Sequence, residues 1–278
     1  MAENGAMLYS PRITVVNSLS FFCLVLFLPF FSAQAAKRTK SEQVQDLLQR
    51  QMSWDENPRN GKNPDGLHFQ FFKIDEAGPS GKSLVTYRVY VPGIPVSKKY
   101  ALTVWRIGSN PRPIPGDIYV NGKGLLMGHK PNAGQEDSDF VGDDELHLAV
   151  QAAQGEPIRY ALESSDKQLL IAGTVVPFPL EDQGQGCRLE VRLATLDADA
   201  VLISADGLPA NADVPFQLLS AGQTETGNFH TDAQGRAVTT DLPFANDLDR
   251  GSLRVSLVTQ ECSTAVQVRW GKKSYLQR

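Results

Sequence analysis

The chain of 278 residues carries 27 Lys and Arg against 31 Asp and Glu, so its formal net charge at pH 7 is −4. A mildly acidic chain without a basic patch argues against nucleic-acid binding, because proteins that bind nucleic acid must neutralise its phosphates. Its 23 Gly and 17 Pro are scattered, and long helical periodicity is nearly absent. These features predict an all-β protein.

An apolar run at residues 21–31 is followed by the small-residue site Ala33-Gln34-Ala35. The run is too short to span a bilayer, and it resembles the apolar core of a secretory signal peptide cleaved after Ala35. We therefore expect a secreted or periplasmic protein. The alternative is a membrane anchor over residues 13–36, because the basic segment 37–40 would favour retention of that flank in the cytoplasm.

One short helix is expected after the cleavage site. Ser41 is a favourable N-cap residue, and an apolar stripe at helical spacing follows it, comprising Val44, Leu47, Leu48 and Met52. From residue 67 the hydrophobic period changes to two, which is typical of half-buried strands. Strands are expected around 69–71, 85–91, 100–107, 146–150, 158–162 and 169–176, with an Asn121-Gly122 hairpin turn and long loops at 108–116 and 128–143.

The C-terminal part has the clearest strand pattern. Seven short strands with regularly spaced turns are expected at 187–193, 201–205, 214–218, 227–231, 236–242, 253–258 and 262–270. That pattern is typical of an immunoglobulin-like sandwich. The expected organisation is a signal peptide (1–35), a short helix and linker (36–60), an N-terminal β-sandwich (61–180) and a C-terminal immunoglobulin-like β-sandwich (181–278), with an interdomain linker around 177–186.

The stretch Ala205–Asn211 and the turn Thr231–Gly235, together with the seven-strand pattern, resemble bacterial immunoglobulin-like domains of the IPT/TIG kind. The resemblance covers residues 187–271. The Cys-containing last strand and Trp270-Gly271 are also similar to the ends of uncharacterised secreted bacterial proteins. This resemblance implies a binding, spacing or supporting module, and it implies no catalytic residue.

Cys187 and Cys262 remain after cleavage, and both fall on the apolar parity of their strands. In an oxidising compartment two inward-facing cysteines are expected to form a disulfide. No Cys-x-x-Cys spacing favours a redox or metal-binding pair instead. The chain therefore predicts a cross-linked sandwich.

The densest acidic cluster lies in the loop after residue 128. It is a weak candidate for calcium, through Asp137, Asp139, Asp143, Asp144 and Glu145, because calcium prefers several carboxylate oxygens on a flexible loop. The spacing does not match an EF-hand, and a solvated loop is the alternative. No other cofactor is expected.

No catalytic residue is expected, because the chain has neither a Gly-x-Ser-x-Gly elbow nor a His-Glu-x-x-His motif. The sequence favours a non-enzymatic binding or structural role at the cell surface or in the periplasm. The partner expected is a polysaccharide or another envelope protein, with Trp54 and Tyr119 as candidate contacts. The alternative is a hydrolase, or an enzyme accessory module, that acts on a cell-wall or extracellular polysaccharide.

Overall fold

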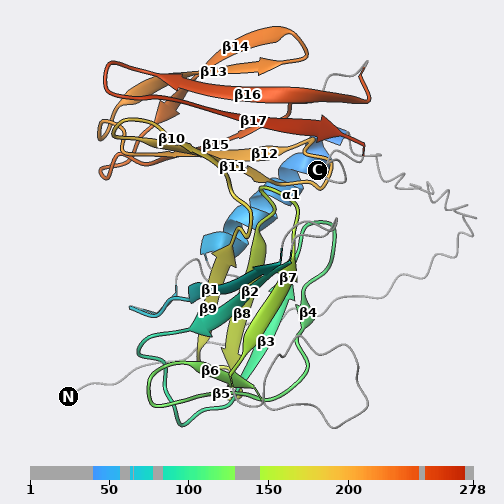
Figure 1. The fold of residues 1–278 in the computed structure, drawn as a ribbon, viewed down its shortest axis with the longest axis vertical. Helices are drawn as coiled ribbons and strands as arrows, with labels where there is room; N and C mark the ends of the chain where they lie inside the picture. The colour runs from blue at the N-terminus through green and yellow to red at the C-terminus, as the bar shows by residue number, and fades with distance from the viewer. Residues whose placement is uncertain are drawn as a thin grey trace, which may run out of the picture. The chain divides into compact units, whose positions relative to one another are not determined.

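The computed structural model describes residues 40–56, 63–64, 66–77, 84–128, 145–243 and 248–272. Within these ranges the chain forms one helix and a series of antiparallel sheets (Figure 1). All of these described residues belong to one compact unit. The structure confirms the predicted all-β sandwich fold. The predicted signal peptide lies outside the described residues.

Strands β1 to β9 form two sheets, which we call the N-terminal sandwich. One sheet has the order β1-β2-β7, and the other has the order β6-β5-β3-β8-β9 with β4 paired to β3. The bounds are β1 Gln70–Ala77, β2 Leu84–Tyr90, β3 Tyr100–Trp105, β4 Arg112–Pro113, β5 Ile118–Val120, β6 Leu126–Gly128, β7 His147–Gln151, β8 Ile158–Ser164 and β9 Leu170–Val175.

Alternation of side chains explains how the N-terminal sandwich encloses its core. Along β2, Val85, Tyr87 and Val89 are buried, whereas Arg88 is exposed. Side chains of this parity pack against buried residues of the facing sheet, such as Leu102. The sequence pattern with a period of two therefore selects the face of each strand that enters the core.

Strands β10 to β17 form the C-terminal sandwich, from two sheets of order β10-β11-β12-β15 and β14-β13-β16-β17 (Figure 1). The bounds are β10 Leu180–Gln183, β11 Arg188–Leu193, β12 Val201–Asp206, β13 Asp213–Ser220, β14 Gln223–His230, β15 Ala237–Asp241, β16 Arg250–Val258 and β17 Ser263–Gly271. With β11 taken as strand A, this is the A-B-E and C′-C-F-G arrangement of immunoglobulin-type sandwiches, preceded by one extra strand.

The core of the C-terminal sandwich contains Trp270, which is 1% exposed, and the pair Cys187 and Cys262. The two cysteines form the predicted disulfide, with Cα atoms 5.7 Å apart and 75 residues apart in sequence. The bond joins the residue that precedes β11 to the residue that precedes β17. It therefore links one sheet of the sandwich to the other.

The helix α1 spans Lys40–Glu56. It is longer than the helix that the apolar stripe over 41–52 predicts. Leu48 is buried in a small cluster with Ala194 and Ala200, which lie at the ends of β11 and β12. This contact fixes one face of the helix against the C-terminal sandwich, and most helical stability comes from such tertiary packing.

Two segments expected to be loops contain short strands. β4 lies within 108–116, and β10 lies within the expected linker at 177–186. Leu180 is buried and pairs with Val191, so tertiary pairing fixes a strand where local composition indicated a turn. The expected division near residue 180 stays a prediction.

Candidate binding groove

An open groove of about 820 Å³ lies between α1 and the turn that follows β3. Its walls include Asp46, Gln49 and Arg50 from the helix and Trp105, Ser109 and Asn110 from the strand end and turn. The volume falls in the range of about 300–1,000 Å³ that is usual for small-molecule sites. We call this feature the Trp105 groove.

Trp105 is half-buried at the last position of β3, and its ring is held on two sides. The indole N–H donates a hydrogen bond to the carbonyl of Ser109 at 2.9 Å. The Arg159 guanidinium lies 5.3 Å from the ring centroid, in cation–π geometry. The indole is therefore oriented before any ligand arrives.

The turn opposite the helix is fixed by hydrogen bonds and by one ion pair. Ser109 donates to the carbonyl of Arg106 from its backbone N–H and from its hydroxyl, at 3.2 and 2.9 Å. Gly108 has a φ of 74°, a conformation that glycine adopts at low cost. The Arg106 guanidinium binds both carboxylate oxygens of Glu156, at 2.9–3.0 Å, and Glu156 also accepts from the backbone N–H of Ala153.

A buried glutamine connects the helix wall to the residues behind Trp105. Gln51 accepts a hydrogen bond from Arg159 at 3.1 Å and donates to the carbonyl of Ala194 at 2.6 Å. Gln51 and Arg159 are both buried. Buried polar groups must be paired. These two hydrogen bonds therefore fix the position of α1 relative to the strand that carries Trp105.

The exposed polar groups of the groove lie on its two rims. Asp46 and Arg50 form an ion pair of 2.7 Å on the helix, and Gln49 and Asn110 are exposed amides. A fixed indole bordered by amide and charged side chains suits a ligand with apolar C–H faces and many hydroxyls. A sugar ring has both.

Of the two aromatic contacts predicted from the sequence, the one whose side chain is described lies elsewhere. Tyr119 is 39% exposed on β5, opposite Met127, and it does not line the Trp105 groove. Trp54 belongs to α1, but its side chain lies outside the described part of the protein. Trp105, which the sequence did not single out as a contact, is the aromatic residue of the groove. Its place at the end of a strand, just before Gly108 and Ser109, is the sequence signal for partial exposure.

Most of the predicted calcium site, namely Asp137, Asp139, Asp143 and Asp144, lies outside the described residues. The Glu145 carboxylate is described, and it pairs with Arg88 at 2.9 Å and with His147 at 3.2 Å. In the described ranges no three side chains of His, Cys, Asp or Glu come together as a metal site. The calcium site therefore stays a prediction.

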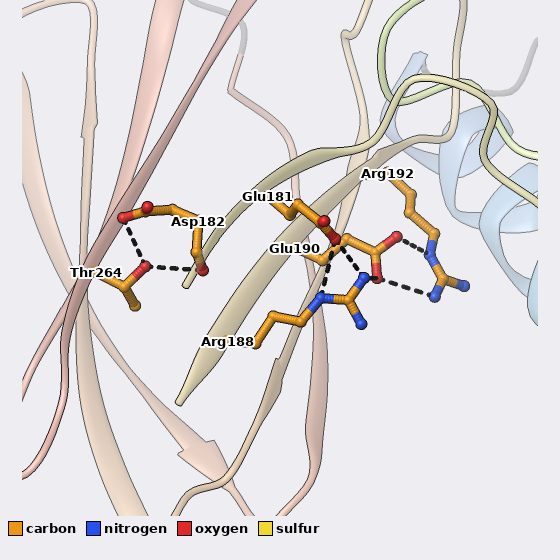
Figure 2. A network of polar contacts seen from close by, with 6 residues as sticks. All are labelled: Glu181, Asp182, Arg188, Glu190, Arg192 and Thr264. Carbon is orange, nitrogen blue, oxygen red and sulfur yellow. Dashed lines mark hydrogen bonds and ion pairs between the residues drawn. The ribbon is translucent and has the colours of Figure 1, made fainter. Parts of the chain in front are cut away.

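A pair of carboxylates lies on the outer face of the sheet that contains β10 and β11 (Figure 2). Glu181 and Glu190 are opposite each other in the strand register. Arg188 binds Glu181, and Arg192 binds Glu190 at 2.8 and 3.2 Å. The hydrogen bond to Glu181 raises the pKa of Arg188. Because guanidinium groups occupy both carboxylates, this network is structural rather than an acid–base pair for hydrolysis.

The same view shows Asp182 reaching toward β17 (Figure 2). Its carboxylate accepts hydrogen bonds from the Thr264 hydroxyl at 2.8 Å and from the backbone N–H of Ala265 at 3.0 Å. These bonds lower the pKa of Asp182. They tie β10, in one sheet, to β17 in the other.

No protein-family model matches the chain, and no curated protein has a significantly similar sequence. Among solved structures, the chain is similar to one described as "Biofilm associated protein - BSP domain", at 10% identity and a TM-score of 0.20. That match covers 83% of this chain and 55% of the other, so the chain spans about half the length of that structure. The IPT/TIG-like resemblance stays a prediction. No described helix is both long and apolar enough to cross a bilayer.

Proposed function

We propose that this protein is an exported, non-enzymatic binding protein of the cell surface or periplasm, and that its Trp105 groove holds a segment of polysaccharide. The observation that carries this proposal is the fixed indole of Trp105, bordered by the exposed amides of Gln49 and Asn110. An oriented aromatic ring loses little entropy when a sugar stacks on it. Amides on both rims can donate to and accept from sugar hydroxyls.

Export is supported by the short apolar run at 21–31 with its Ala-x-Ala site, and by the Cys187–Cys262 disulfide. Disulfides persist in oxidising compartments. Mass spectrometry of the protein from its host should find an N-terminus near residue 36. An intact N-terminus in a membrane fraction would instead support the anchor over 13–36.

The groove is tested by screening the purified protein on an array of neutral and acidic glycans. We expect binding that is weakened about tenfold by Gln49→Ala with Asn110→Ala, since each lost hydrogen bond contributes roughly 0.5–1.5 kcal/mol. Both side chains are exposed, so folding should be unaffected. Tyr119→Ala, outside the groove, is the matched control.

Three results would contradict the proposal. The first is glycan binding that the groove variant and the Tyr119 control weaken equally. The second is binding of peptides but of no glycan. The third is turnover of a polysaccharide or glycoside by the purified protein, which would support the alternative of a hydrolase.

A further inference from the structure

The outer face of the β14-β13-β16-β17 sheet is exposed and polar. Along β16, Leu253, Val255 and Leu257 are buried in the core, so the alternate residues face outward. On all four strands the outward positions carry mostly hydroxyl, amide and guanidinium groups. They include Gln217, Thr224, Thr226, Asn228, Ser252, Ser256 and Gln267. We call this surface the arginine face.

Three arginines form a staggered row on the arginine face. Arg254 pairs with Gln267, Arg269 pairs with Ser252, and Arg250 lies two residues before Ser252 on the same strand. Arg269 is therefore diagonal to both other arginines, at the roughly 7–8 Å typical of such neighbours. All three are exposed, and within the described ranges none of them makes an ion pair.

Two shallow hollows lie on the arginine face. The first, of about 470 Å³, is lined by Arg250, Arg269 and Lys272. The second, of about 550 Å³, is lined by Arg254 and Asp182 together with neutral residues, which include Thr224 and Ser256 and the apolar Leu219 and Val258. Positive charge and hydroxyl groups therefore share the concave parts of the surface.

Several carboxylates that border this surface are already engaged or face away, and Asp213, at an outward position of β13, pairs with His230. Asp249 pairs with Lys272 at 3.4 Å. Asp182 is held by the Thr264 hydroxyl and the backbone N–H of Ala265 at the rim of the second hollow. Glu225 lies on β14 with the parity opposite to Thr224, and so points to the other side of the strand.

Like charges on neighbouring strands repel one another, and a bound anion removes that cost. We propose that the arginine face binds an acidic polysaccharide, with its carboxylates on Arg250, Arg254 and Arg269. The guanidinium fork matches the two oxygens of a carboxylate. The surrounding hydroxyls and amides suit sugar hydroxyls. A single-stranded nucleic acid is disfavoured, because the outward positions of the described strands carry no Phe, Tyr or Trp for base stacking.

This site shares no residue with the Trp105 groove, and it stands independently of the proposed function. The probes are polygalacturonate, alginate and hyaluronate, measured by isothermal titration with the full protein. Binding to at least one probe is expected to weaken by about tenfold or more in the double variant Arg254→Gln with Arg269→Gln. The logarithm of the association constant of the natural protein should also fall linearly with the logarithm of the salt concentration, as it does for proteins that bind other polyanions.

The matched control is Lys99→Gln with Lys123→Gln, which removes two exposed charges from the N-terminal sandwich. It should change the affinity less than about twofold, because exposed charges beyond a Debye length are screened. Methyl-esterified polygalacturonate should bind weakly, since the same polymer then lacks its charges.

Several results would overturn the proposal. They are failure to bind any of the three polymers, equal weakening by the lysine control, and tighter binding to duplex DNA or to anionic lipid vesicles. Retained near-ultraviolet circular dichroism of the arginine variant shows that a loss of binding is not a loss of folding. Arg254→Lys with Arg269→Lys keeps the charge. Its partial rescue would show that charge and fork geometry both contribute.

Discussion

Glu156 is 2% exposed, and its carboxylate is fully used by Arg106 and by the backbone N–H of Ala153. Glu156→Ala leaves the guanidinium and that N–H without their partner. We expect the free energy of unfolding to fall by about 2–4 kcal/mol, somewhat below the value for a wholly buried pair, because Arg106 is 38% exposed. Urea unfolding followed by circular dichroism measures this.

Glu181→Ala is the control for that measurement. Glu181 also pairs with an arginine, but both side chains are about two-fifths exposed. Exposed ion pairs contribute roughly 0–1 kcal/mol, so the loss should be correspondingly small. Equal losses in the two variants would contradict the structural role assigned to Glu156.

Asp166 gives a pH dependence with a definite sign. Hydrogen bonds from Lys98, from the Ser164 hydroxyl and from the backbone N–H of Gln168 lower its pKa from 3.8 to about 2. A carboxylate with a lowered pKa in the folded state stabilises it above the unfolded pKa, and that stabilisation is lost as the pH falls through the folded pKa.

Asp166→Asn should therefore lower the melting temperature at pH 7. The difference from the natural protein should shrink between about pH 4 and pH 2, where the native carboxylate becomes protonated. Thermal scans at several pH values check this. A difference that stays constant down to pH 2 would show that the asparagine acts through packing and not through charge.

Single residues also show where sequence interpretation fails. Trp270 lies in the core, as the alternation of β17 requires, because every second residue of that strand is buried. Along β3 the same alternation gives Trp105 the parity of Ala101 and Thr103, opposite to that of the buried residues, so its ring faces away from the core. The contacts of Trp105 with Arg159, and of Arg159 with Gln51, join segments over 50 residues apart, so local patterns cannot predict them.

At the scale of elements, two links join the β10–β11 edge of one sheet to β17 in the other sheet. The Cys187–Cys262 disulfide is the covalent link, and Asp182 makes the other through Thr264 and the backbone of β17. A bond across 75 residues stabilises the folded state by about 4 kcal/mol in the chain-entropy treatment. We expect Cys187→Ala with Cys262→Ala to lose about 2–4 kcal/mol, measured by chemical unfolding.

The reduced natural protein is the matched control for the double alanine variant, because it lacks the cross-link but keeps both sulfur atoms. Reduction should account for most of the loss. If the reduced and oxidised proteins have the same midpoint of unfolding, the disulfide adds nothing to stability. The packing of side chains around it would then account for the stability of this edge.

Strand positions in the C-terminal half were predictable because each strand has one buried face, and that alternation appears directly in the sequence. The pairing partners were not. Leu180–Gln183 is a strand only because β11 lies beside it, and its charged Glu-Asp pair carries no local strand signal. Likewise the arginine face joins side chains of β16 and β17 whose proximity depends on register.

At the scale of the whole molecule, the sequence predicted an all-β chain with two sandwich cores, and the structure has two corresponding hydrophobic clusters. It gave no indication that Ile107, from the N-terminal half, packs into the second cluster, nor that Gln51 bonds to Ala194. Such contacts depend on tertiary docking. The surfaces that meet in these contacts are too small and too polar to leave a periodic pattern in the sequence.

The cross-link also has a mechanical consequence. When tension is applied to the chain on either side of the C-terminal sandwich, the load passes from Cys187 to Cys262 through the sulfur atoms. The enclosed segment then bears no force. Stretching single molecules in an optical trap should release its roughly 250 Å of hidden contour length only after a reductant is added. In a molecule fastened to a surface in flowing liquid, the arginine-bearing strand β16 would thus stay out of the load path while the segments beyond the cross-link are pulled straight.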